Sequence, residues 1–153
     1  MKNYLCSIIL CLFTFSVSAS LPLQVSMLDI VENSDHILTV TVVGVDMIDS
    51  EGKQILDENE RTGPDSGNKI RLVAKVSKIH QTNSKNVPEL IKIPLDPFMH
   101  YVFGDVKKRH DGRSYTVIVV LKGSSFEPAY PGIFRFPEYE LETLEFLYKS
   151  LHK

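Results

Sequence analysis

The chain has 153 residues, a formal net charge of −2 at pH 7 and 43% hydrophobic residues. This length is sufficient for one domain with a hydrophobic core. Generic binding to nucleic acid or to anionic membranes usually shows as a basic surplus, which this chain lacks, so the composition argues against both.

Residues 1–19 have the features of an export signal. Lys2 supplies a positive start, residues 5–17 are mostly apolar, and Val17-Ser18-Ala19 places small or compact residues before a predicted cut at Ser20. The apolar stretch is shorter than the roughly 20 residues that a membrane-spanning helix needs. We therefore predict an exported domain of residues 20–153, periplasmic or secreted, with no membrane anchor after cleavage.

Both cysteines, Cys6 and Cys11, lie inside this predicted signal. The mature chain would then have no disulfide, no thiolate metal site and no cysteine nucleophile. Small secreted animal domains often depend on disulfides, so an exported domain of this size without them fits a bacterial periplasm better.

The first predicted elements are a short helix and a long strand. Ser26 and Asp29 have the spacing of a capping box, which indicates a helix that begins after Ser26 and ends near residues 33–35. Residues 36–48 are rich in β-branched side chains on both faces, which is typical of a well-covered central strand. Gly44 within this strand predicts a bulge or a sharp bend.

A long polar connection and two further strands come next. Residues 49–68 are polar and acidic, with three glycines and Pro64, and predict a long loop. Residues 69–79 alternate apolar and polar side chains, which indicates an antiparallel strand with one wet face. Residues 90–95 predict a strand at an edge, because Pro94 cannot donate a ladder hydrogen bond.

The remaining half of the domain predicts two strands and a helix. Residues 96–112 mix apolar, basic and turn residues and favour no single element. Residues 114–121 have the clearest strand pattern in the chain, and residues 133–136 predict a short strand after the Pro131-Gly132 turn. From Pro137 onward, leucines at helical spacing, with glutamates first and basic residues last, predict a C-terminal amphipathic helix.

This order of elements predicts a mainly β, α+β fold: a small antiparallel, curled or closed five-stranded sheet with a helix at each end. Residues 70–79 and 112–121 resemble the strands of small exported bacterial domains with an OB-like or tissue-inhibitor-like barrel, in which a V-x-K-I strand is followed by a G-x-x-Y-x-V-x-L strand; here Val119 stands at the last position of that pattern. The resemblance covers roughly residues 35–125 and implies a fold rather than an activity. Inhibitors of that class act through an N-terminal cysteine, which the predicted mature chain lacks.

The candidate partner-binding residues are in two segments. Residues 126–136 combine aromatics and an arginine in a loop stiffened by prolines, a composition typical of protein-binding hot spots, although the same aromatics would also serve to close the end of a barrel. The acidic loop would steer a basic partner toward the domain. The residues so assigned are Phe126, Tyr130, Phe134 and Arg135 in the first segment and Asp57, Glu58 and Glu60 in the second.

Two alternatives remain open from the sequence. Histidines and aspartates between residues 96 and 111 suit a divalent metal and would support a small metal-dependent enzyme. A barrel of this size would also hold a small apolar ligand. The metal candidates are Asp96, His100, Asp105, His110 and Asp111.

The other motifs give weaker patterns. Asp57, Asn59 and Gly63 depart from a calcium loop because Arg61 falls at a ligand position. Ser124 and Ser125 lack a nucleophile elbow, and Lys107 to His110 form a single basic cluster. We therefore expect a non-enzymatic protein-binding module without cofactor or bound metal, an inhibitor or immunity protein of the periplasm whose partner is another protein and not nucleic acid.

Overall fold

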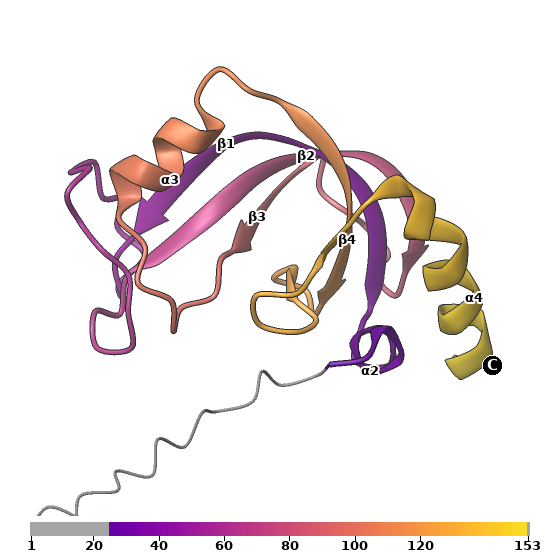
Figure 1. The fold of residues 1–153 in the computed structure, drawn as a ribbon. Coiled ribbons are helices and arrows are strands. Elements are labelled where there is room, and N and C mark those ends of the chain that lie inside the picture. Colours follow the sequence, from indigo (N-terminus) through magenta and orange to yellow (C-terminus); the bar gives the residue numbers. More distant parts are fainter. Residues whose placement is uncertain (1–24, 153) are drawn as a thin grey trace, which may run out of the picture.

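The computed structural model describes residues 25–152, so the export signal predicted for residues 1–19 lies outside the described residues. Within these residues, six strands form one antiparallel sheet that curls strongly, and three α-helices pack at its two ends (Figure 1). The elements in chain order are α2 (Met27–Glu32), β1 (His36–Ile48), β2 (Lys69–Thr82), β3 (Leu90–Pro94), α3 (Phe103–His110), β4 (Tyr115–Lys122), β5 (Glu127–Pro128), β6 (Arg135–Phe136), the 3-10 helix η1 (Glu138–Glu140) and α4 (Leu141–Leu151).

The strand order is β3-β2-β1-β4-β5, with β6 pairing β4 beside β5. β3 and β5 lie at opposite ends of this order, yet the curl brings their Cα atoms within 8 Å of each other. No strand pairing joins them among residues 25–152, so the sheet is not closed. The expected mainly β, antiparallel fold with a C-terminal helix is confirmed, and a closed barrel is not.

Bulges produce much of the curvature. The pairing of β1 with β2 shifts register between Ile37 and Leu38, between Thr39 and Val40, and between Val42 and Gly44. Each extra residue bends its strand and increases the local twist, which is how an antiparallel sheet curls toward closure. The irregularity predicted at Gly44 is therefore present.

The main hydrophobic core lies on one face of the curled sheet. Side chains at alternate positions of β1 (Leu38, Val40 and Val42) are fully buried there, as the period of two in a strand requires. Strands β2, β3 and β4 contribute to the same cluster, and Phe126 and Phe134 fill it from the segment after β4.

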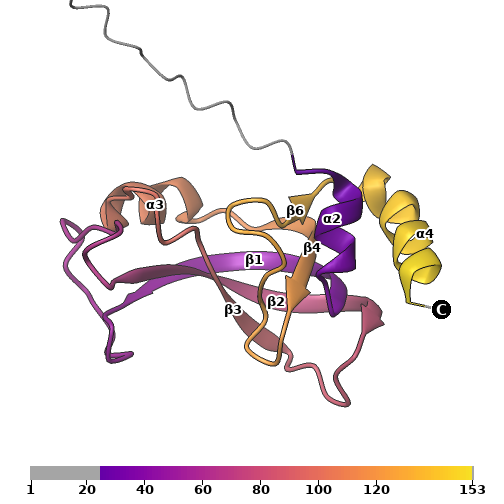
Figure 2. The same cartoon turned by 90° about the horizontal axis from the view of Figure 1, so that it is seen from below.

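Helices cover the other face and one end of the sheet. Ile37, Ile118 and Val120 pack under α2 and α4 with Leu144 and Tyr148, whereas Met47 and Ile70 pack under α3 with Phe103 and Val106. Figure 2 shows α3 at one end of the sheet and α2 with α4 at the other. The capping box at the start of α2 is present, since the Ser26 hydroxyl accepts the Asp29 N–H and the Asp29 carboxylate accepts the Ser26 N–H.

The five strands predicted from the sequence all form, and β5 adds a sixth of two residues. Among the helices of the described residues, α3 is the one without a sequence prediction, and it lies in the stretch 96–112. Within the described part of the chain, no helix has the length and apolar character to cross a membrane.

Candidate protein-binding site

The curled sheet leaves a seam where β3 and β5 approach without pairing. A hollow of about 140 Å³ lies in this seam. One wall is the end of β3 and the loop after it, residues 94–98, and the other wall is the β4–β5 turn and the residues after β5. From here on, the seam means the surface formed by the residues that line this hollow. They are Lys69, Pro94, Leu95, Asp96, Pro97, Phe98, Lys122, Glu127, Pro128 and Pro131.

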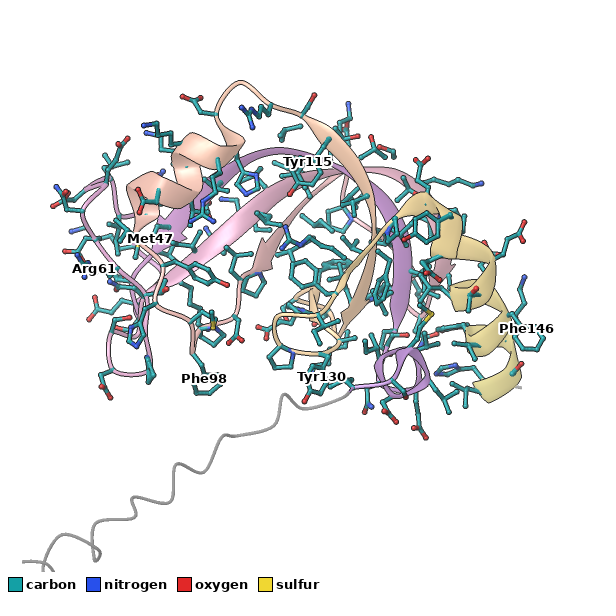
Figure 3. The ribbon with its side chains drawn as sticks, viewed as in Figure 1. Met47, Arg61, Phe98, Tyr115, Tyr130 and Phe146 are labelled. Atoms are coloured by element: carbon teal, nitrogen blue, oxygen red, sulfur yellow. The ribbon has the colours of Figure 1, made fainter. Side chains whose placement is uncertain are left out.

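Phe98 is the most exposed aromatic side chain of the seam. Its exposed fraction is 69%, and that of the next residue, Met99, is 52%. A second hollow, of about 150 Å³, is also bordered by Phe98 and is lined by residues of the segment 63–69 and by Pro97. Figure 3 shows Phe98 projecting from its loop on the open side of the curved sheet, away from the main core.

The loop that carries Phe98 is held in a defined turn. Pro97 fixes its own φ, and Asp96 forms an Asx turn because its Oδ1 accepts the Phe98 N–H at 2.9 Å. The Met99 N–H also bonds to the Asp96 carbonyl, at 3.3 Å. Phe98 is therefore presented by a turn with few conformations to lose on binding.

Hydrogen bonds from Thr62 hold the same loop on the side of residues 49–68. Its side chain is buried, its hydroxyl donates to the Met99 carbonyl at 2.7 Å, and it accepts the Tyr101 N–H at 3.1 Å. The Thr62 N–H bonds to the Tyr101 carbonyl at 3.0 Å. Three hydrogen bonds thus join the long loop 49–68 to the residues that follow Phe98.

The opposite wall of the seam contains a strained residue. Phe126 has φ of 56°, in the left-handed region that bulky side chains rarely adopt. Its ring is buried and lies 4.8 Å from the His36 ring, between centroids. Burial in the core offsets the backbone strain and fixes the turn that carries Lys122 and Glu127.

Four charged residues surround the seam hollow: Lys69, Asp96, Lys122 and Glu127. Two are cationic and two anionic, so the seam is electrically balanced. Within residues 25–152, none of the four takes part in an ion pair. They leave charged groups of both signs beside an apolar hollow.

The residues predicted from segment 126–136 separate into two groups. Phe126 and Phe134 have exposed fractions of 6% and 1% and belong to the main core. Tyr130 is half-buried, and Arg135 is exposed with its guanidinium 5.4 Å from the Phe134 ring centroid. The segment borders the seam through its prolines, Pro128 and Pro131.

The predicted acidic residues lie at the α3 end of the molecule. Glu58 accepts a hydrogen bond from Lys107 Nζ at 2.6 Å, and its carbonyl accepts the Gly104 N–H. Asp57 accepts its hydrogen bonds from Asn59, and Glu60 accepts one from Asn68. The acidic loop therefore packs beside the basic helix α3, and the two neutralise each other in part.

The metal candidates do not converge. Asp96 lies in the seam, His100 beside Gly63, and Asp105, His110 and Asp111 on or after α3. No group of three or more histidine, cysteine, aspartate or glutamate side chains within residues 25–152 is placed to hold a metal ion. Neither the 96–111 set nor the calcium-like loop is assembled into such a group.

His110 has an unusual environment for an isolated histidine. Burial, followed by the nearby charges of Arg135 and Arg109, lowers its pKa. Its ring stacks on Tyr115 with 5.7 Å between centroids, and its Nδ1 is buried without a hydrogen-bond partner. These features favour a neutral imidazole that packs as an aromatic ring.

Two further histidines join strands to other elements. His36 is fully buried, with Nδ1 2.8 Å from the Thr82 hydroxyl and Nε2 3.0 Å from the Gly123 carbonyl. The His80 side chain is 3% exposed, with Nε2 2.7 Å from the Thr39 hydroxyl and Nδ1 3.1 Å from Glu145 Oε1. Hydroxyl, imidazole and carboxylate follow here in the order of a hydrolase triad. In this structure the Nε2 contact joins β2 to β1, and the Nδ1 contact joins β2 to α4.

Comparisons of this chain with protein-family models, with curated proteins and with solved structures find no match. The site is therefore defined by geometry alone. Sequence reasoning passed over Phe98 because residues 96–112 favoured no element. The available signal was the Asp-Pro-Phe run itself, in which an Asx turn with proline places the next side chain at a loop surface.

Proposed function

We propose that this chain is an exported, non-enzymatic protein-binding module that recognises its partner through the seam. The observation that carries this proposal is Phe98, 69% exposed on a hydrogen-bonded turn and bordering two hollows. Exposed aromatics with low conformational entropy are the side chains that dominate binding energy at protein interfaces. Export, predicted from residues 1–19, would bring the seam to a partner in the periplasm or outside the cell.

The finer fold that we propose is an OB-like, partly open barrel. Its support is the strand order β3-β2-β1-β4-β5, the helix α3 between β3 and β4, and the approach of β5 to β3. In such a barrel the edges that do not pair are the natural place for another chain to attach.

An inhibitor or immunity protein is the role that we propose for such a module. A rigid convex aromatic flanked by hollows and by charges of both signs is suited to block a cleft on another protein. The acidic side chains of Asp57 and Glu60, exposed at the α3 end, would favour the approach of a basic partner.

The experiment is comparative capture with three baits: the wild-type chain, Phe98→Asp and Phe146→Asp. Phe146 is a matched control because it is also a phenylalanine, 68% exposed, on the distant helix α4. We expect one host protein to be retained by the wild type and by Phe146→Asp, and lost from Phe98→Asp. A partner retained equally by all three folded baits would contradict the proposal.

A further inference from the structure

We infer that the seam also seats a second copy of this chain, as a symmetric dimer that covers the partner-binding surface. The inference rests on the proposed function, because it names an occupant for the same surface. Three features of the seam support it: a knob beside a hole of matching size, charges of both signs, and a rigid frame on each side.

The knob and the hole match in volume. A cavity of about 150 Å³ is sufficient to take up a benzene ring, and the two hollows that Phe98 borders have volumes of about 140 and 150 Å³. Prolines and Leu95 supply much of the lining of the first hollow. A phenyl ring from outside therefore fills one hollow and loses the water around it.

The position of the knob makes the surface self-complementary. In a twofold contact, residue i of one copy meets residue j of the other and the reverse contact is made at the same time. Phe98 borders the hollow of its own chain, so a twofold axis beside Phe98 places each ring in the hollow of the other copy. A knob remote from its hole would instead build an open chain of molecules.

The charges of the seam are also self-complementary. The balanced set Lys69, Asp96, Lys122 and Glu127 has no ion-pair partner within the described residues. A uniformly charged rim would repel an identical copy, whereas this rim offers each cation of one copy an anion on the other. A second copy thus satisfies the charges of the seam without any additional protein.

The backbone on both sides of the hollow is rigid, which keeps the proposed dimer interface from rearranging. Thr62 and the Asp96 turn fix the Phe98 loop, and the buried Phe126 fixes the opposite wall. A Cβ atom added at Gly132 would lie 3.3 Å from Asp96 Oδ2, so the two walls come close together at this point. The contact is small, and small interfaces belong to weak complexes, so we expect a dissociation constant on the order of 100 µM.

Sedimentation velocity of the mature chain across a concentration series tests the dimer. We expect a reversible monomer–dimer equilibrium for the wild type, a monomer for Phe98→Asp, and an unchanged equilibrium for Phe146→Asp. A wild type that stays monomeric at millimolar concentration, or a dimer unaffected by Phe98→Asp, would overturn the inference.

Disulfide trapping tests the geometry. Because the sequence has no cysteine after Cys11, engineered cysteines in the mature chain are the only thiols present. A Met99→Cys chain mixed with a Pro131→Cys chain should form a cross-chain disulfide, since Met99 follows the knob and Pro131 lines the hole. A Ser150→Cys chain on α4 is the control and should form none with Pro131→Cys; equal yields in the two mixtures would refute the knob-in-hole arrangement.

These results are separable from those of the capture experiment. If the wild type is monomeric but still retains a host protein through Phe98, the dimer is excluded and the proposed function is supported. If the dimer depends on Phe98 but no host protein is captured through Phe98, the dimer is supported and the proposed function is excluded.

Discussion

The two ends of the curled sheet are finished in different ways. At the α2–α4 end, Asp35 accepts the Gly123 N–H at 2.7 Å and Asn83 Nδ2 at 2.9 Å, and the Tyr148 hydroxyl donates to Asn83 at 3.0 Å. At the seam, an aromatic ring stands in solvent and four charged side chains have no ion-pair partner in the described part of the chain. The first end satisfies its polar groups internally, whereas the second has charged groups without an ion pair, which we propose are available to another molecule.

This difference separates stability from recognition. Buried groups with internal partners contribute to the free energy of unfolding, whereas an exposed side chain contributes little to it. Substitutions at the α2–α4 end should therefore change the free energy of unfolding, and substitutions at the seam should change the binding of another molecule. The following variants test this division in order of expected effect.

Leu144→Ala should destabilise the α2–α4 end. Leu144 is a fully buried residue of α4, so the truncation removes apolar contacts between α4 and the sheet and leaves a cavity that costs about 2–5 kcal/mol. Leu56→Ala is the matched control, since Leu56 is 77% exposed and its truncation should change the free energy of unfolding by less than about 0.5 kcal/mol. Urea denaturation measures both; similar losses in the two variants would refute the assignment of the core.

Thr62→Val should loosen the seam without touching Phe98. The valine keeps the shape of threonine but leaves the Met99 carbonyl and the Tyr101 N–H without their partner, at a cost of about 1–3 kcal/mol. Amide hydrogen exchange should rise in residues 96–101 and stay unchanged in α4. Uniformly faster exchange throughout the protein would show that Thr62 supports the whole fold instead of this loop.

Asp46→Asn should remove a pH-dependent contribution at the β3 edge. Burial raises the pKa of Asp46, but hydrogen bonds and charges from Arg71 (2.7 Å) and Lys92 (2.7 Å) outweigh it, so the pKa is lowered overall. A lowered carboxyl pKa stabilises the folded state above the unfolded value of about 4, and this stabilisation is lost as the pH falls through the folded pKa. Because Lys92 is largely exposed, we expect a loss of about 1–2 kcal/mol at neutral pH.

Thermal denaturation of wild type and Asp46→Asn across the acid range measures this contribution. The two curves should differ at neutral pH, begin to approach each other as the pH falls below about 4, and meet only below the lowered folded pKa of Asp46. A difference that does not depend on pH would assign the effect of Asp46 to packing rather than to its charge.

Phe98→Ala should have the smallest effect on stability. The side chain is 69% exposed, so the free energy of unfolding should change by less than about 0.5 kcal/mol. A loss of several kcal/mol, measured by urea denaturation, would show that Phe98 holds the fold together and would weaken its assignment to recognition.

The strands were predictable because their patterns are local. The β-branched run 36–48, the alternation from residue 69 and the run 114–121 all appear as strands, and the Ser26–Asp29 capping box forms as its spacing requires. α3 escaped prediction because its eight residues FGDVKKRH carry only two buried apolar side chains and no capping side chain. Its helical state depends on packing against Met47 and Ile70, which lie far away in the sequence.

The seam was predictable only in part, for a similar reason. Segment 126–136 borders the seam, but periodicity cannot decide which of its aromatics face inward, and Phe126 and Phe134 are in the core. The hollow arises from two segments about 30 residues apart that meet through the curl of the sheet. Only the tertiary fold makes them neighbours.

The most direct test of the account is site-specific photo-crosslinking in cells that make the protein. A photoreactive residue at position 98 is compared with one at position 146, where the exposure is equal. The account predicts a discrete crosslinked product from position 98 and none from position 146. No product from position 98, or the same products from both positions, would contradict the claim that the seam is the recognition surface.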